Sequence, residues 1–137
     1  EISCSLVGSE MCIRDRKNLE MLACIKNKIE IEDIRHAMEQ VGLDPDDKRT
    51  YKKYSLGMKQ KLGIAAAFME KPDIIILDEP INALDEAGAK QVHKILEEQK
   101  KRGALIIIAC HDKEELEMLS DEIIEIYEGR IVAGEKE

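Results

Sequence analysis

A chain of 137 residues is one domain or part of one, and it is long enough to bury about two-thirds of the surface it exposes when unfolded. Its net charge of -8 argues against binding to nucleic acid, because a nucleic-acid footprint needs clustered lysine and arginine in excess. With one Phe, three Tyr and no Trp, the aromatic content is too low for a base-stacking surface. The core must therefore be aliphatic.

Membrane spans, secretory signals and metal-binding cysteine patterns are not found in the sequence. No apolar run approaches the ~20 residues of a membrane span, and the N-terminus lacks the basic segment and long apolar core of a secretory signal. The four cysteines show no C-x-x-C spacing and no matching histidines, which predicts free thiols rather than a zinc site or disulfides. We expect a soluble, cytosolic protein.

Residues 1–16, EISCSLVGSEMCIRDR, differ in composition from the Lys-, Glu- and Ile-rich remainder and follow neither a helical nor an alternating pattern. They resemble the peptide obtained when a sequencing adapter is translated in frame. We therefore expect a non-native leader here, the alternative being an ordinary strand and loop.

Helical spacing of apolar residues begins after this segment. It predicts two short amphipathic helices, one from Leu19 to Lys26 and one from Ile31 to Val41, and Gly42 ends the second. Residues 43–47, LDPDD, predict a turn. The basic residues 48–53 that follow are either solvated surface or a contact for a phosphate or a partner protein.

A third helix is predicted to begin after Ser55 and to end before Pro72. Ser55 is a suitable N-cap, and the residue before a proline avoids helical backbone angles. The orphan N–H groups and positive dipole end of the first turn attract anions such as phosphate, and Gly57 lets the backbone approach closely. The first turn is either a simple cap or a phosphate site.

The run IIILDEP at residues 74–80 ends in two adjacent carboxylates and a proline. An unbroken apolar run suits a parallel strand covered by helices on both faces, and ligands bind beyond the carboxyl ends of such strands. One of the carboxylates of Asp78 and Glu79 can hold Mg²⁺, while the other handles a proton from an attacking water. The alternative is an ordinary helix cap in the following loop.

Asp85 is a natural N-cap, and we predict that the helix it begins runs to Arg102. A second apolar strand follows over residues 104–110. A strand–helix–strand unit of this length forms a parallel pair, so we expect His111 at the same sheet edge as Asp78 and Glu79. An imidazole beside a metal–phosphate site can donate a hydrogen bond to phosphate.

The C-terminal residues predict a short helix at 112–119 and a hairpin. In the hairpin, strands over residues 122–127 and 130–133 flank the turn residues Glu128 and Gly129. No repeat or low-complexity linker interrupts the chain, so no hinge between independent domains is predicted. The fold class indicated is α/β.

Four ordered motifs resemble those of the ATP-binding subunit of ABC transporters. Residues 54–60, YSLGMKQ, resemble the signature motif, and residues 74–79 resemble the Walker B strand with its catalytic glutamate. Residues 82–85, NALD, resemble the D-loop, and His111 resembles the switch histidine. The likeness covers about residues 17–137 and implies a partial P-loop NTPase core of the ABC type, with parallel strands and an α-helical subdomain.

The resemblance implies ATP and Mg²⁺ as cofactors. It assigns Asp78 to Mg²⁺, held through water, and Glu79 to polarising the water that attacks the γ-phosphate. His111 is implied to contact that phosphate.

The same resemblance implies that two ATP-binding subunits form a head-to-tail dimer. Ser55, Gly57 and Met58 of the signature, with Asp85 of the D-loop, are implied to act on a nucleotide bound to the opposite subunit. A membrane-spanning transporter subunit is the other implied partner, which places the protein on the cytoplasmic face of the plasma membrane.

Two departures from the family pattern matter. Tyr54, Leu56 and Met58 replace the first, third and fifth residues of the usual Leu-Ser-Gly-Gly-Gln, a variant that resembles bacterial exporters of the antibiotic-resistance and peptide-export kind. No Gly-x-x-x-x-Gly-Lys-Ser/Thr occurs, although that Walker A loop supplies the N–H cradle and the lysine for the phosphates. We therefore expect a C-terminal fragment that is inactive as an ATPase by itself.

The expected organisation is a non-native leader at residues 1–16, a helical subdomain with the signature motif at 17–70, and the C-terminal half of the catalytic core at 71–137. The expected function of the parent protein is ATP hydrolysis coupled to export. Two alternatives remain open. One is a short, catalytically silent binding module that engages a partner through the helical subdomain, and the other is a soluble ABC ATPase outside transport.

Overall fold

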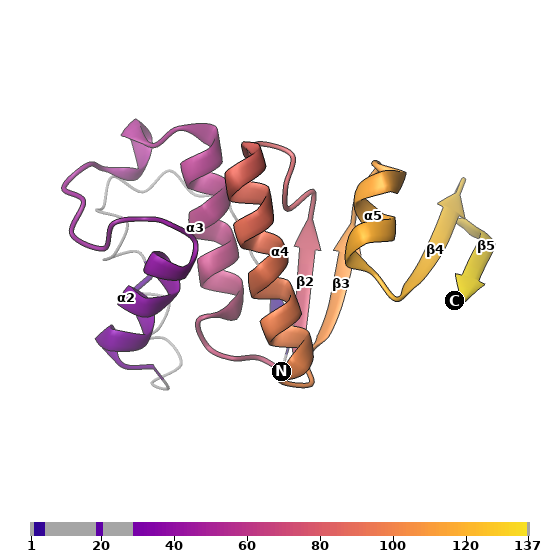
Figure 1. The fold of residues 1–137 in the computed structure, drawn as a ribbon, viewed down its shortest axis with the longest axis horizontal. Coiled ribbons are helices and arrows are strands. Elements are labelled where there is room, and N and C mark those ends of the chain that lie inside the picture. The colour runs from indigo at the N-terminus through magenta and orange to yellow at the C-terminus, as the bar shows by residue number, and fades with distance from the viewer. Residues whose placement is uncertain (1, 5–18, 21–28, 137) are drawn as a thin grey trace.

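The computed structural model describes residues 2–4, 19–20 and 29–136, which form helices packed on a small parallel sheet (Figure 1). The helices are α2 (Ile31–Gln40), α3 (Leu56–Phe68), α4 (Glu86–Lys101) and α5 (Lys113–Leu119), with a 3-10 turn at Tyr51–Lys53. The strands are β1 (Ile2–Cys4), β2 (Ile74–Asp78), β3 (Leu105–Ala109), β4 (Glu122–Tyr127) and β5 (Arg130–Lys136). None of the helices within these ranges is long and apolar enough to cross a bilayer.

The central sheet is parallel, with strand order β1-β2-β3. β2 and β3 pair in register, from Ile74 opposite Leu105 to Asp78 opposite Ala109. This confirms the expected parallel pair, and it places the carboxyl ends of both strands at one edge. The strand β1 lies within the predicted leader and pairs with β2, while the non-native origin of residues 1–16 stays a prediction.

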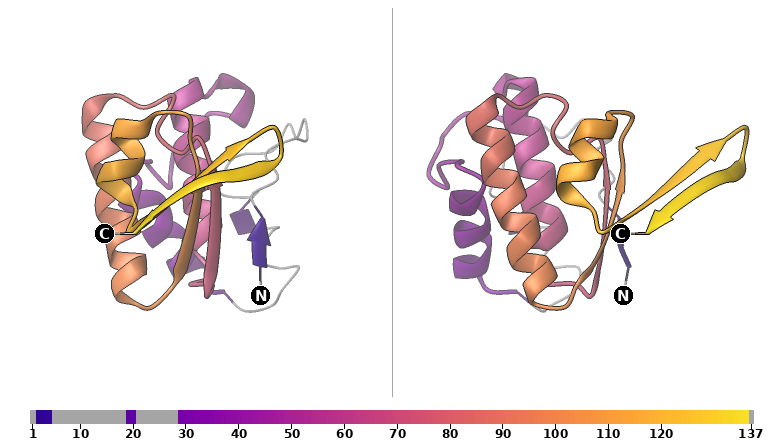
Figure 2. Two further views of the ribbon diagram at one scale, coloured as in Figure 1. Left: turned by 90° about the vertical axis from the view of Figure 1, so that its right-hand side faces the viewer. Right: turned by 45° about the vertical axis from the view of Figure 1, so that its right-hand side comes forward.

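The helices α2, α3 and α4 lie on one side of the sheet (Figure 2). Ile75 and Leu77 of β2 are 1% and 5% exposed, and they belong to one apolar cluster with Leu62 of α3 and Val92 of α4. Burying such a side chain contributes about 1.5–3 kcal/mol. The cluster contains residues from the predicted helical subdomain (17–70) and from the predicted catalytic half (71–137). The boundary between these two parts at residue 70 remains a prediction.

The other face of the sheet departs from the sequence-based expectation. Both strands were expected to be covered on both faces, because their apolar runs are unbroken. Instead, Ile76, Leu105 and Ile107 are 37%, 57% and 47% exposed. The register puts Ile76 opposite Ile107, so these side chains share the face that the described helices do not cover. The expectation was therefore wrong for the described part of the chain.

The predicted end of α2 at Gly42 is confirmed. Gly42 has a φ of +73°, which a residue with a Cβ rarely adopts, and the N–H of Leu43 donates to the Met38 carbonyl at 2.9 Å. The backbone therefore turns sharply away from the end of α2. Leu19 and Glu20 are helical, and the rest of the first predicted helix lies outside the described residues.

The C-terminal hairpin is confirmed, with β5 longer than predicted. Glu128 and Gly129 both have positive φ values, 48° and 75°, as the two central residues of a type I′ turn require. The hairpin extends away from the sheet (Figure 2), and Ile126 and Ile131 are 68% and 72% exposed.

Candidate functional site

The carboxyl ends of β2 and β3 bring Glu79 and His111 into direct contact. The Nδ1 atom of His111 lies 2.6 Å from the Oε1 atom of Glu79, and the backbone N–H of His111 donates to the same oxygen at 3.2 Å. The sequence predicted that these residues would be neighbours, and the parallel pairing of the two strands is the reason. The side chain of Glu79 is 31% exposed and that of His111 is 78% exposed, so the pair is open to solvent on the histidine side.

The backbone of Glu79 is also tightly held. Its φ is +46°, in the left-handed region that is uncommon for a residue with a Cβ. Its N–H donates to the Ala109 carbonyl of β3 at 2.8 Å. Its carbonyl accepts a hydrogen bond from the Nε2 atom of Gln60, on α3, at 2.9 Å. An unusual backbone conformation therefore coincides with the predicted catalytic residue.

The contact between Glu79 and His111 shifts the pKa of both groups in opposite directions. The hydrogen bond from His111 is the main cause that lowers the pKa of Glu79, against the opposing effect of desolvation. The hydrogen bond to Glu79 is likewise the main cause that raises the pKa of His111. The arrangement favours an ionised glutamate and a histidine that carries a proton on the nitrogen facing it.

Cys110 lies beside this pair and has no disulfide partner. Its Sγ atom is 3.7 Å from Oε2 of Glu79 and 3.4 Å from Oε2 of Glu115, so the thiol proton has two carboxylates within reach. Burial is the main cause that raises the pKa of the Cys110 thiol, which disfavours the nucleophilic thiolate. The prediction of a free thiol is confirmed for Cys110. The side chains of the other three cysteines lie outside the described residues.

Asp78 is the last residue of β2 and is exposed at the strand end. Among the described residues there is no cluster of three or more His, Cys, Asp or Glu side chains suited to a metal ion. In nucleotide sites, however, Mg²⁺ needs only one or two protein carboxylates, because phosphates and waters supply its other ligands. The donor set at this strand end therefore fits Mg²⁺ bound together with a phosphate.

The first turn of α3 is organised by Ser55. Its Oγ atom accepts a hydrogen bond from the Met58 N–H at 3.2 Å, which confirms the predicted N-cap. The hydroxyl proton of Ser55 is not used in this bond and can be donated to an anion. The Met58 side chain is half-buried and packs against the apolar core.

Gly57 packs tightly against the loop that follows β2. A Cβ placed on Gly57 would lie 2.7 Å from the carbonyl oxygen of Ala83, a backbone atom that cannot move aside without shifting the loop. The sequence had indicated a close backbone approach at Gly57 for a phosphate. The structure shows a second close approach at the same position, between α3 and residues of the predicted D-loop.

Asp85 caps α4 by accepting a hydrogen bond from the Gly88 N–H at 2.9 Å, as predicted. Gly88 is also close-packed, because a Cβ there would lie 2.8 Å from Oδ1 of Asp85 and 3.2 Å from Cε of Lys61. The N-terminal ends of α3 and α4 therefore lie close together.

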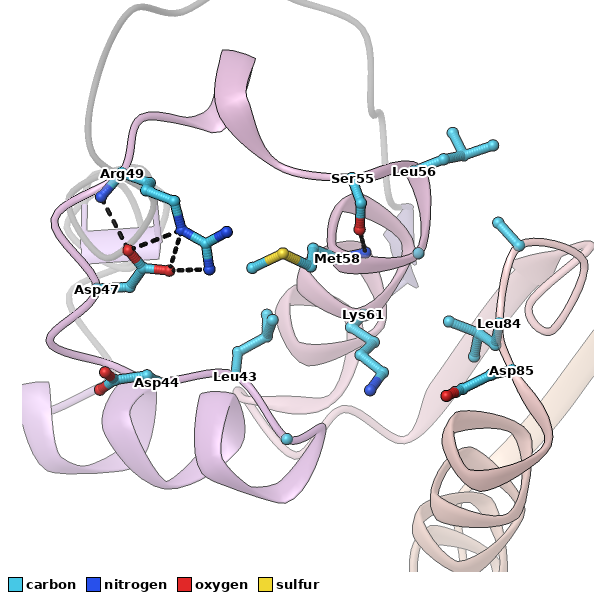
Figure 3. A pocket seen from close by; sticks show the side chains of 13 residues that line it. Leu43, Asp44, Asp47, Arg49, Ser55, Leu56, Met58, Lys61, Leu84 and Asp85 are labelled. Carbon is cyan, nitrogen blue, oxygen red and sulfur yellow. Dashed lines mark hydrogen bonds and ion pairs between the residues drawn. The ribbon is translucent and has the colours of Figure 1, made fainter.

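Ser55, Gly57, Met58 and Asp85 all line one cavity of about 670 Å³ (Figure 3). Its other lining residues come from the loop after α2, from α3 and from the loop before α4: Gly42, Leu43, Asp44, Asp47, Arg49, Leu56, Lys61, Ala83 and Leu84. None of Asp78, Glu79 and His111 lines it. The structure thus divides the seven predicted site residues into one group at the strand ends and another around this cavity.

Lys61 was not identified by sequence reasoning. It lies four residues after Gly57 on α3, so the two residues share a helix face, and that spacing was the available signal. Arg49, from the predicted basic patch, also lines the cavity but is paired with Asp47, with an Nη2 to Oδ2 distance of 2.6 Å, and stacks over Tyr54 at 5.5 Å. Its charge is therefore largely engaged within the chain.

Comparison with protein families and curated proteins gives a consistent result. The family model described as ABC transporter matches residues 4–82, which is more than half of the chain. The chain is 48% identical over 119 residues to the uncharacterized ABC transporter ATP-binding protein YybJ of Bacillus subtilis (strain 168), covering 87% of this chain and 55% of YybJ.

Two further relatives have names that specify what they transport. The chain is 39% identical over 117 residues to the bacitracin transport ATP-binding protein BcrA of Enterococcus faecalis, covering 85% of this chain and 38% of BcrA. It is 47% identical over 95 residues to the lantibiotic transport ATP-binding protein SrtF of Streptococcus pyogenes, covering 69% of this chain and 42% of SrtF. The chain thus spans about half or less of the length of these relatives.

Solved structures show the same fold. The chain superposes on a structure described as the ATP binding subunit of an ABC transporter with a TM-score of 0.83 and 26% identity, covering 96% of this chain and 55% of that one. It also superposes on the dimeric structure of MJ0796, described as a bacterial ABC transporter cassette, with a TM-score of 0.79, 19% identity and coverage of 90% and 56%. The second likeness, at its low identity, concerns the fold alone.

The close packing at Gly57 predicts that Gly57→Ala destabilises the chain. The added Cβ overpacks against the Ala83 carbonyl, which typically costs about 1–3 kcal/mol and outweighs the gain in helix propensity. Urea denaturation measures the free energy of unfolding. The matched control is Leu56→Ala in the same turn, where the side chain is 72% exposed and a change within about 0.5 kcal/mol is expected. A Gly57→Ala variant as stable as the wild type contradicts the tight packing.

The contact between Glu79 and His111 predicts a pH-dependent contribution to stability. The raised pKa of His111 stabilises the fold below its ordinary value of 6.5, and this is lost as the pH rises through the folded-state pKa. The lowered pKa of Glu79 stabilises the fold above its ordinary value of 4.5, and this is lost as the pH falls through the folded-state pKa. The pair therefore contributes most between these two ordinary values.

Denaturant titrations of the wild type and His111→Gln across this pH range measure the effect. The difference in unfolding free energy is expected to be largest between pH 4.5 and 6.5 and to shrink at higher pH. The same pair of titrations with His36→Gln is the control, because His36 is exposed on α2. A pH-independent difference for His111→Gln rules out the pairing.

Proposed function

Because the chain belongs to the ABC transporter family of ATP-binding proteins, we propose that it is the C-terminal part of the ATP-binding and ATP-hydrolysing subunit of a bacterial exporter. The observation that carries the proposal is the contact between Glu79 and His111 at the adjacent carboxyl ends of β2 and β3. The names of BcrA and SrtF, transport proteins for bacitracin and a lantibiotic, support an exporter of antibiotic or peptide substrates.

At the strand ends, Glu79 is the residue that orients and polarises the attacking water. Its lowered pKa keeps the carboxylate ionised and able to accept a hydrogen bond from that water. His111, whose side chain is largely exposed, can turn a ring N–H toward the γ-phosphate while its backbone N–H remains on Glu79. Asp78 would hold Mg²⁺ through water, and the ion would neutralise charge on the phosphates.

The residues around the cavity serve a nucleotide held by a second ATP-binding subunit in a head-to-tail dimer. Ser55 offers its hydroxyl proton, and the first turn of α3 offers its positive dipole end to an anion. Gly57 and Met58 belong to the same turn, and Asp85 lines the cavity from the loop before α4. The separation of this cavity from the strand-end residues supports two roles for one chain, one on its own nucleotide and one on its partner's.

The remaining partner in the proposal is a membrane-spanning transporter subunit, which places the parent protein on the cytoplasmic face of the plasma membrane. Nucleic acid is not a partner, in keeping with the net charge of -8. The substrate is selected by the membrane-spanning subunit rather than by the residues of this chain.

The sequence contains no Walker A loop, which generates a direct test. The purified chain of 137 residues is expected to release no phosphate from ATP above background. A chimera in which the N-terminal segment of YybJ precedes residues 17–137 is expected to hydrolyse ATP, with intact YybJ as the reference. Phosphate release by the isolated chain overturns the fragment assignment, and a folded chimera without ATPase activity overturns the proposed function.

The role of Glu79 is tested in the same chimera. Glu79→Gln keeps the size of the side chain but removes the carboxylate, so kcat is expected to fall by about 10²–10⁴-fold while ATP remains bound. Measured phosphate release and retained nucleotide distinguish loss of chemistry from loss of binding. The matched control is Glu97→Gln, on an exposed part of α4. Wild-type kcat in the Glu79→Gln variant contradicts the proposed role of Glu79 in polarising the attacking water.

A further inference from the structure

We propose that Gln60 is a positioning residue that fixes the orientation of Glu79 and couples it to the first turn of α3. This inference rests on the proposed function for its meaning in catalysis. The contact itself is a feature of the fold and can be tested without nucleotide.

Contacts from different parts of the chain hold Glu79. The N–H of Glu79 donates a hydrogen bond to the carbonyl of Ala109, on β3, at 2.8 Å. The carboxylate accepts hydrogen bonds from His111, through the backbone N–H at 3.2 Å and through Nδ1 at 2.6 Å. The Nε2 atom of Gln60 donates to the Glu79 carbonyl at 2.9 Å across a separation of nineteen residues. Gln60 is thus the side chain that links α3 to the backbone of Glu79.

The backbone of Glu79 needs such support. With a φ of +46°, its Cβ crowds the following carbonyl, and Pro80 narrows the accessible angles further. A conformation of this kind persists when surrounding contacts over-determine it, and it is common at functional sites. The carbonyl of Glu79 accepts two hydrogen bonds, a longer one from the N–H of Asn82 in the following loop at 3.4 Å and a shorter one from Gln60 at 2.9 Å. Removing the hydrogen bond from Gln60 leaves only the longer bond, which lets the peptide unit rotate. The carboxylate then moves relative to His111.

The position of Gln60 on α3 gives the contact a second consequence. Ser55 and Gly57, at the start of this helix, line the cavity, and Gln60 lies about one turn further along. A helix moves as a rigid unit over such a distance. Displacement of the first turn of α3 by a bound anion therefore changes the position of the Gln60 amide, and with it the carboxylate of Glu79.

Nuclear magnetic resonance of the isotopically labelled 137-residue chain tests the contact. In the wild type, one Nε2 proton of Gln60 is expected to exchange slowly and to show scalar coupling to the carbonyl carbon of Glu79. Gln60→Met, which keeps the length of the side chain but lacks the donor, is expected to shift the Glu79 amide and His111 ring resonances.

The matched control is Gln91→Met, the same change at a half-buried position on α4, where the amide lies against Gly42 rather than Glu79. It is expected to leave the Glu79 and His111 resonances unchanged. If Gln60→Met does the same, the positioning role is overturned. Where Gln60→Met does not fold, the wild-type spectrum decides, because a rapidly exchanging Gln60 amide without coupling to Glu79 overturns the contact.

Kinetics in the active chimera separate positioning from mere stability. Gln60→Met is expected to lower kcat by up to about 10²-fold with the KM for ATP unchanged, because misplacing a catalytic group costs rate rather than binding. Gln91→Met is expected to retain wild-type kcat. Wild-type kcat in Gln60→Met overturns the inference. An inactive wild-type chimera overturns the proposed function instead. The contact between Gln60 and Glu79 is then tested by the NMR spectra alone.

Discussion

The parallel pairing of β2 with β3 is the constraint on which the site depends. Because the strands run in the same direction and pair in register, the residues that follow each strand meet at one edge of the sheet. Glu79 follows β2 and His111 follows β3 by two residues, so their contact at 2.6 Å is a consequence of the register. A shift of one residue in the pairing separates them and turns the apolar side chains to the opposite face.

The helix α3 connects this strand edge to the cavity. Its first turn, capped by Ser55, lies beside Ala83 at the close approach of Gly57, and Gln60 reaches the carbonyl of Glu79. One short helix therefore touches both groups of predicted site residues. If the two groups serve two nucleotides, as we propose for this chain, α3 is the helix that contacts both.

The open face of the sheet shows what the apolar pattern alone does not decide. Ile76 and Ile107 carry the signature of a strand buried on both sides, yet the described helices cover only the face of Ile75 and Leu77. Burying an apolar side chain lowers the free energy of the folded chain, but this effect has no direction and does not determine which helix or strand covers the side chain.

The sequence by itself determined the features that depend on neighbours along the chain. The caps at Ser55 and Asp85, the turn at Gly42, the hairpin at Glu128 and the motifs at the strand ends were predicted, because each needs only a few consecutive residues. The tertiary structure alone decided the packing of Gly57 on Ala83, the hydrogen bond from Gln60 to Glu79 and the shared cavity. These contacts join segments separated by many residues, and their distances follow from how the helices pack on the sheet.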